Sequence, residues 1–402
     1  TFVESSGEMI NVEAIYFRFS KDLLEAIGLW PSRQTRLDQL RYALLFGILS
    51  TVIVFHFTTF MTAECTLELI VKVLASVFIF INIMIKYSAF WMNTVSIKKL
   101  MEQLQRTCGE LKDKNEIAIM QKYGLISRRY TISLTASFVC GEFSFISIQC
   151  WSSILDIVQP RNESRPHVIV FPMEYFVDQQ KYFYLILLHI NTAIFIGGIT
   201  VLATLSVLVS CQECVCGMFT VACYRIEHAM STDALRNVSL NSKNLISHGI
   251  IRAVDIHREA MKLSKFLMSR FEVAFGFLIM AGVIGLTLNL FRVFQVLCSE
   301  FNIGELFLPT GCIFLIILYM FIANYIGQDL TDHNSQIFTT VYNVPWYEAP
   351  LHVQKLIVFL LQRGTKDFTL SVGGFFNGSM KCFAALANTS ISYFTVLYST
   401  QR

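Results

Sequence analysis

The sequence predicts an all-α membrane protein with seven transmembrane helices. Of the 402 residues, 54% are hydrophobic and 15% are charged, and the mean hydropathy is +0.53. A soluble domain has too little interior to bury so much apolar surface, so lipid must solvate part of this chain. A helix needs about 20 apolar residues to cross the hydrocarbon core of a bilayer. Seven segments meet this requirement: 42–62, 69–94, 130–155, 182–212, 273–297, 306–328 and 375–400.

The basic residues of the connecting segments predict the orientation of these helices. Cytoplasmic connections carry an excess of lysine and arginine. Such residues are frequent before the first span and in segments 95–129 and 213–272, whereas segments 63–68 and 298–305 contain none. The alternation places the N-terminus in the cytoplasm and the C-terminus outside the cell. G-protein-coupled receptors have the opposite orientation, so the pattern excludes that class.

This topology leaves one usable glycosylation site. Asn-X-Ser sequences begin at Asn162, Asn237, Asn377 and Asn388. Only Asn162 is expected in an outer connection, clear of a helix. The N-terminal segment is mixed and charged, so no cleavable signal peptide is expected. Because the chain does not begin with Met, we expect further residues before Thr1.

Composition and motifs exclude several functions. The net charge of +3 predicts no nucleic-acid partner. There is no zinc-peptidase motif, phosphate-binding loop or nucleophile elbow, so we expect no enzyme, no catalytic residue and no cofactor. The 11 cysteines follow no disulfide framework. A cluster of them has no suitably spaced histidine pair, so packing or lipidation is expected there rather than a metal site: Cys211, Cys214, Cys216 and Cys223.

The last helix has two different faces. At 100° per residue, one narrow stripe is small and polar, with Val396 at its edge: Lys381, Ala385, Asn388, Ser392, Thr395 and Ser399. The opposite side is apolar: Phe383, Leu386, Tyr393, Phe394 and Leu397. A membrane helix with such a stripe either packs closely against a neighbour or lines water, and the stripe alone does not choose between them.

The C-terminal region combines four recognisable features: the Tyr-Asn-Val-Pro-Trp-Tyr sequence of 342–347, the amphipathic segment 353–363, the Gly373-Gly374 link and the ending of 392–397. In these features it resembles insect odorant receptors. The order of elements and the length extend the resemblance to the whole chain. The chain lacks a long second cytoplasmic insert, and in this it resembles a ligand-tuning subunit rather than the shared co-receptor.

The resemblance implies an odorant-gated, non-selective cation channel. Such a subunit would form a heterotetramer with the co-receptor in the plasma membrane of a sensory-neuron dendrite, surrounded by lipid. It implies four parts: a cytoplasmic segment 1–41, helices one to six with an outer ligand cavity in 42–328, a cytoplasmic anchor segment 329–374, and a pore-lining helix 375–402. The family's hydrophobic gate corresponds to Val396, with Thr400 one turn further out, where many relatives carry aliphatic residues. The expected pore residues are Asn388, Ser392, Thr395, Val396, Ser399 and Thr400.

The candidate ligand residues lie on three spans. Ser144, Ser147 and Trp151 recur at i, i+3 and i+7, and therefore share one helical face. By depth, Phe78, Tyr184 and Leu188 are expected to complete a cavity for a small volatile. The volatile would bind mainly through apolar area.

Charged and polar residues within the spans have several possible roles. Glu142 lines water, pairs with Lys72 or Lys86, or is protonated. Arg292 is expected to extend to the membrane interface, and Lys381 either extends likewise or faces the pore. His189 and Asn191 are expected to form interhelical hydrogen bonds.

Two other functions remain open from sequence. A gustatory receptor channel has the same topology, but its last helix usually begins with Thr-Tyr and finishes with Gln-Phe, whereas this chain has Ser392-Tyr-Phe and then Tyr398-Ser-Thr. A secondary transporter would show internal repeats and paired broken helices, and the sequence shows neither.

Overall fold

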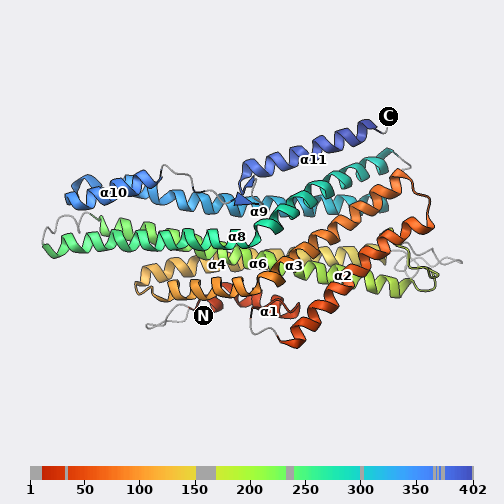
Figure 1. Ribbon diagram of the computed structural model, residues 1–402, viewed down its shortest axis with the longest axis horizontal. Coiled ribbons are helices and arrows are strands. Elements are labelled where there is room, and N and C mark those ends of the chain that lie inside the picture. The colour runs from red at the N-terminus through yellow and green to blue at the C-terminus, as the bar shows by residue number, and fades with distance from the viewer. Residues whose placement is uncertain are drawn as a thin grey trace.

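The structure, a computed structural model, describes residues 11–31, 35–150, 169–231, 240–298, 303–364, 368, 371–372 and 376–400. The long helices run side by side along the longest axis of the molecule (Figure 1). In chain order the elements are a π-helical turn η1 (Glu13–Phe17), α1 (Arg18–Ala26), α2 (Arg36–Thr62), α3 (Leu67–Gly109), α4 (Lys114–Gln149), α6 (Phe183–Ala229), α8 (Leu240–Cys298), α9 (Ile303–Asn343), a 3₁₀ turn η2 (Trp346–Glu348), α10 (Leu351–Gly364), β1 (Ser371–Val372), β2 (Phe376–Asn377) and α11 (Met380–Thr400).

Six described helices are long and apolar enough to cross a membrane: α2, α3, α4, α6, α8 and α9. They account for the first six predicted spans, although α4 ends at Gln149, before the predicted end of the third span, and α6 begins at Phe183, one residue after the predicted start of the fourth. The seventh, α11, has 21 residues, and its polar stripe lowers its mean hydropathy. Its start also differs from the prediction, because Phe376–Asn377 form strand β2, which pairs antiparallel with β1.

Local capping residues fix where several helices begin. Thr35 and Asp38 form a capping box at the start of α2, in which each side chain accepts a hydrogen bond from the other's backbone N–H. Thr66 caps α3, and Asp113 caps α4. Such short polar side chains satisfy backbone N–H groups that have no partner within the helix.

The two kinds of connection lie at opposite ends of the bundle. The turn between α3 and α4, within the basic segment 95–129, lies at the end that carries α10, whereas the α2–α3 connection, which lacks basic residues, lies at the end where α11 finishes (Figure 1). Alternation of basic and non-basic connections along the chain predicts this separation, because consecutive long helices run in opposite directions.

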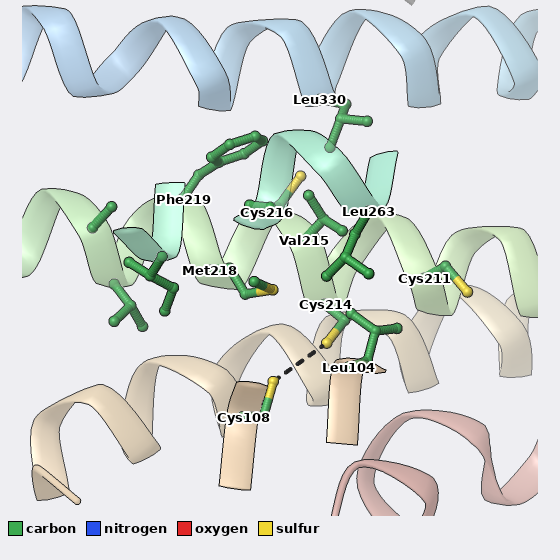
Figure 2. Packing of buried hydrophobic residues seen from close by; sticks show 14 of the residues in the cluster. Leu104, Cys108, Cys211, Cys214, Val215, Cys216, Met218, Phe219, Leu263 and Leu330 are labelled. Carbon is green, nitrogen blue, oxygen red and sulfur yellow. Dashed lines mark hydrogen bonds between the residues drawn. The ribbon is translucent and has the colours of Figure 1, made fainter. Parts of the chain in front are cut away.

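The main hydrophobic core lies where α3, α6, α8 and α9 continue beyond their predicted spans. It combines Leu104 and Cys108 of α3 with Leu263 of α8 and Leu330 of α9 around α6 (Figure 2). The α6 cysteines are fully or almost fully buried, and Sγ of Cys214 lies 3.8 Å from Sγ of Cys108. Free cysteines therefore pack here as small apolar residues, as expected from sequence.

Candidate functional site

A cavity of ≈ 790 Å³ lies among α3, α4, α6, α8 and α9, and α11 borders it. Its wall is mostly aliphatic and aromatic. Cys382 and Leu386 contribute the border from α11. Cavities of roughly 300–1,000 Å³ with apolar walls are typical of small-molecule sites, so this cavity is the candidate ligand site.

Glycines shape the cavity in two ways. A Cβ atom added at Gly141 or Gly311 would meet no atom within 4 Å, so these positions leave open space in the wall. A Cβ at Gly197 would lie 2.6 Å from Cδ1 of Ile83, and at Gly198 it would lie 1.8 Å from Cε2 of Phe138. These last two glycines therefore allow α6 to approach α3 and α4 closely.

Three aromatic rings from different elements meet in the cavity wall. The ring of Phe171, from the connection before α6, lies 6.1 Å from Phe80 and 5.9 Å from Phe145, centroid to centroid. The same connection is held against α2 by the backbone hydrogen bond from Glu174 N–H to the Phe55 carbonyl, 3.0 Å long. The described part of this connection, residues 169–182, therefore contributes to the candidate ligand site through Phe171.

His189 helps to hold this connection. Its Nδ1 lies 2.8 Å from the Tyr175 hydroxyl, and its Nε2 lies 3.0 Å from Oγ1 of Thr51. Burial raises the pKa of the Tyr175 hydroxyl, which favours its protonated form. His189 thus forms the interhelical contacts expected from sequence. Asn191 likewise donates to Oε1 of Gln149 at 3.3 Å.

Most polar side chains of the cavity wall bond to their own helix. Asn82 donates to the Phe78 carbonyl, Ser144 to the Cys140 carbonyl and Asn324 to the Met320 carbonyl. Lys86 differs, because its Nζ lies 3.5 Å from the centroid of the Tyr319 ring. Of the three roles left open for Glu142, a pair with Lys86 or Lys72 is not formed among the described residues.

The predicted ligand residues divide into two groups. Phe78 and Ser144 line the cavity. Ser147 is exposed outside its wall, as are Tyr184 and Leu188, with exposed fractions of 64% and 63%. Trp151 and the glycosylation candidate Asn162 lie outside the described residues, as does the Gly373-Gly374 link. No residue of α8 or α9 was predicted as a ligand contact, although both helices line the cavity. The glycines within these apolar spans could have indicated open space beside them.

The polar stripe of α11 points away from the rest of the chain. All six expected pore residues are exposed on the single chain: Asn388, Ser392, Thr395, Val396, Ser399 and Thr400. The other face packs on α8 and α9, with Leu386 buried and the Ser390 carbonyl accepting from Oγ1 of Thr287 at 3.2 Å. Tyr393, predicted on the packed side, is exposed.

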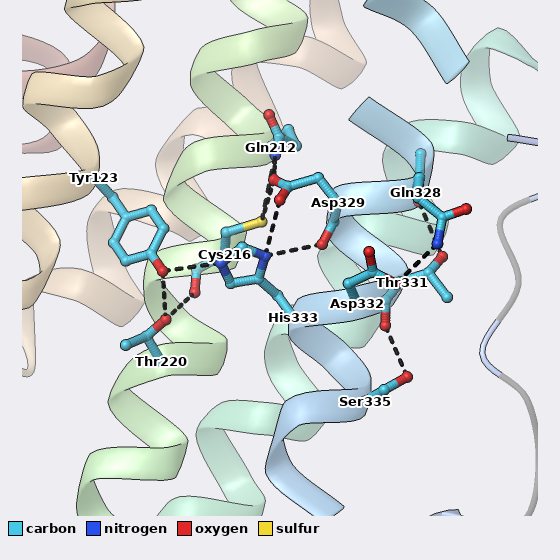
Figure 3. Close-up of polar contacts among 11 residues, drawn as sticks. Tyr123, Gln212, Cys216, Thr220, Gln328, Asp329, Thr331, Asp332, His333 and Ser335 are labelled. Atoms are coloured by element: carbon cyan, nitrogen blue, oxygen red, sulfur yellow. Dashed lines mark hydrogen bonds and ion pairs between the residues drawn. The ribbon is translucent and has the colours of Figure 1, made fainter. Parts of the chain in front are cut away.

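A polar cluster joins α4, α6 and α9 beside the cavity (Figure 3). Asp329 accepts from Nε2 of Gln212, a cavity residue, at 2.5 Å and lies 3.7 Å from Sγ of Cys216. Nδ1 of His333 lies 3.3 Å from Oδ1 of Asp329, and its Nε2 lies 2.9 Å from the Tyr123 hydroxyl. Cys216, Asp329 and His333 are metal-ligating types, with ligand atoms within 4.8 Å of one another. However, both nitrogens of His333 and both oxygens of Asp329 have protein partners, so the cluster is a satisfied hydrogen-bond network.

Arg292 forms ion pairs that the sequence did not predict. Its side chain, expected to extend to the membrane interface, is buried within the chain, with 4% of the residue exposed. Its guanidinium donates to Glu68 at 2.7 Å and to Glu305 at 2.8 Å. The ion pairs explain the burial, because paired acceptors compensate for lost hydration. Arg292 thereby joins α8 to the first turns of α3 and α9.

Comparison with known proteins agrees with this architecture. The family model described as 7tm odorant receptor matches residues 66–391, more than half of the chain. Odorant receptor 10 of Aedes albopictus is 25% identical over 96 residues, covering 24% of this chain and 26% of the relative. Odorant receptor 47a of Drosophila melanogaster is 27% identical over 90 residues, covering 21% and 23%. These alignments therefore span about a quarter of each relative.

Solved structures show the same fold over almost the full length. The insect olfactory receptor OR5 from Machilis hrabei in complex with eugenol has a TM-score of 0.74 and 14% identity, covering 96% of this chain and 98% of that one. A second structure of the same receptor has a TM-score of 0.69 and 15% identity, covering 95% of this chain and 97% of that one. The predicted fold class is thus confirmed: an all-helical membrane protein.

The family match also decides between the functions left open by sequence. It favours an odorant receptor over a gustatory receptor or a transporter, and it agrees with the prediction that the chain is not an enzyme. The chain is a multi-pass membrane protein, and it belongs to the 7tm odorant receptor family.

Proposed function

We propose that this chain is the ligand-tuning subunit of an odorant-gated cation channel. A small volatile binds in the cavity, and the pore along α11 opens. The observation that supports this most strongly is that Cys382 and Leu386 of α11 border the cavity while the polar face of the same helix is exposed. A ligand in the cavity would therefore contact the proposed pore helix directly. Eugenol in the related Machilis receptor supports the same use of this fold.

Ligand binding would depend mainly on apolar contact. Removal of apolar surface from water contributes about 25 cal/mol per Å², and the wall offers few polar groups. Of the residues predicted from sequence, we retain Phe78 and Ser144 as ligand contacts because both line the cavity. Ser147, Tyr184 and Leu188 lie outside the wall. Trp151 stays a prediction.

The gate in this proposal is a ring of apolar side chains around the pore axis. Asn388, Ser392, Thr395 and Ser399 would line the ion path, with Val396 closing it by excluding water and Thr400 further out. Binding can open the pore only if the volatile has a higher affinity for the open state. Contact between the ligand and α11 gives a physical route to that difference.

Assembly would take place through the anchor segment 329–374 and through α11. Val353, Ile357 and Leu360 bury one face of α10 against the chain's own core. Its other face leaves Leu351 and Phe359 exposed, which suits contact with another subunit. We propose a heterotetramer with the odorant receptor co-receptor, in the plasma membrane of a sensory-neuron dendrite, with the N-terminus cytoplasmic.

Coexpression in oocytes tests the proposed function. With the insect co-receptor, at least one member of a broad volatile panel is expected to evoke an inward cation current. The subunit alone is expected to give little or none, because a pore of four identical α11 helices would carry four exposed Lys381 side chains that repel cations. The co-receptor expressed alone is the matched control. Robust odorant currents from this subunit alone would contradict the heteromer, and no specific current from the pair at normal surface levels would contradict the function.

Glycosylation tests the proposed orientation. Asn162 is expected to be the only modified sequon, because it alone is predicted to lie in an outer connection. Glycosidase treatment should shift the wild-type band on a gel, and Asn162→Gln should remove that shift. Asn237→Gln is the control, since position 237 is expected in the cytoplasm. A shift that persists in Asn162→Gln and disappears in Asn237→Gln would reverse the topology.

A further inference from the structure

Lys86 stands out among the residues of the cavity wall. It lies on α3 among apolar neighbours, and only 8% of the residue is exposed. Among the described residues it forms no ion pair and no hydrogen bond. Its one described polar interaction is with the face of the Tyr319 ring on α9, at 3.5 Å from the centroid. A cation over an aromatic face is stabilised by the ring quadrupole, but that interaction uses no acceptor atom.

The chemistry of the pair differs from that of the other wall residues. Serine and asparagine side chains such as Ser144 and Asn82 already donate to carbonyls of their own helices. The lysine amine carries up to three donors, and the tyrosine hydroxyl carries one. No described residue accepts from either group. Two donors without acceptors therefore meet in an otherwise apolar cavity, where an unmade hydrogen bond is costly.

Glu142 lies in the same wall but does not supply the missing acceptor. It is half-buried on α4 and forms no ion pair among the described residues. Glu142 and Lys86 are therefore not paired, and the described polar contact of Lys86 is with the ring of Tyr319.

We propose that Lys86 and Tyr319 form the polar end of the ligand site and select volatiles whose apolar body carries a carbonyl or carboxylate oxygen. The oxygen accepts from Nζ of Lys86 and from the Tyr319 hydroxyl. Lys86 follows Phe78 by about two turns of α3, so the apolar body extends from there toward Phe78. This inference rests on the proposed function of the cavity and adds the class of ligand.

A pair of isosteric ligands tests the selection. In 2-heptanone and 2-methyl-1-heptene the same skeleton carries C=O or C=CH₂, and homologues from five to ten carbons allow for cavity length. Binding is measured as thermal stabilisation of the purified full-length chain, and currents are measured with the co-receptor. A hydrogen bond to a charged group predicts a preference of about 10- to 100-fold for the ketone over the alkene. Heptanoic acid tests whether a carboxylate is accepted as well as a carbonyl.

Variants assign the preference to the two residues. Lys86→Met is expected to bring the ketone-to-alkene ratio close to one, chiefly by weakening ketone binding, whereas Lys86→Arg retains much of it. Tyr319→Phe keeps the ring and is expected to lower the ratio less. Lys72→Met is the matched control, because it makes the same change on α3 at a residue outside the wall.

The outcomes separate this inference from the proposed function. A wild-type ratio near one, no binding across the series, or an unchanged ratio in Lys86→Met would overturn the ligand class, and the last result would leave the pair as a contact between α3 and α9. If Lys86→Met fails to fold, the wild-type ratio and Lys86→Arg decide. Selective ketone binding without any current would support the ligand class and contradict channel function. Equal currents from both ligands would support channel function and contradict the ligand class.

Discussion

Gly311→Phe is expected to weaken the odorant response by one to two orders of magnitude while leaving the subunit at the cell surface. Gly311 lines the cavity, and an added Cβ would meet no atom within 4 Å. The phenyl ring would therefore enter open space and exclude ligand without displacing the helices. Losing apolar contact equivalent to one side chain costs about 1.5–3 kcal/mol, or roughly a 10- to 100-fold higher half-maximal concentration. Concentration–response curves with the co-receptor measure this.

The matched control is Gly47→Phe. Gly47 also has no atom within 4 Å of an added Cβ, but it lies on α2 and outside the cavity wall. Its concentration–response curve is expected to match the wild type. An agonist that acts on the co-receptor should still evoke current in both variants. An unaltered odorant response in Gly311→Phe, at equal surface expression, would place the ligand elsewhere.

Val396→Ser is expected to raise the current that flows without odorant. Val396 lies at the edge of the polar stripe, and 57% of its surface is exposed on the single chain. In the proposed pore its apolar side chain excludes water, and a hydroxyl would weaken that barrier. A lower barrier raises the resting population of the open state. Basal current and permeability ratios are measured with an unmutated co-receptor.

Leu397→Ser serves as the neighbouring control. Leu397 packs against the buried cluster that includes Val71 and Phe291, so its loss should reduce folding and surface expression instead of opening the pore. The two variants are compared at matched surface levels. If Val396→Ser changes neither leak nor permeability, this residue is not the gate.

The helices were predictable because lipid imposes a strong compositional signal. All seven predicted spans correspond to described helices. The full lengths of the helices were not predictable in the same way. Hydropathy identifies the residues that cross the bilayer, but it does not show how far a helix continues beyond the membrane. Thus α6 continues to Ala229 and α9 to Asn343, where polar and apolar residues alternate around a protein core. The start of α11 moved to Met380 because the residues before it form a short β ladder.

The candidate site was only partly predictable. Helical periodicity identified the exposed stripe of α11 because that face depends on one helix alone. The cavity depends on which helices become neighbours, and span depth could not show that Tyr184 and Leu188 lie outside its wall. The same limit explains why the ion pairs of Arg292 were not predicted, since Glu68 precedes it by 224 positions in the chain. The contact of Lys86 with Tyr319 is equally long-range.

The accessibility of a cysteine introduced in α11 tests most directly whether ligand binding opens the pore. In Thr395→Cys, coexpressed with the co-receptor, a charged thiol reagent is applied from outside with and without a saturating volatile, and the rate of current change is recorded. Wild-type channels control for the native cysteines. We expect the volatile to increase the modification rate and the attached charge to reduce the cation current. Equal rates in both conditions, or modification that leaves the current unchanged, would contradict a pore along α11 that opens when the cavity is occupied.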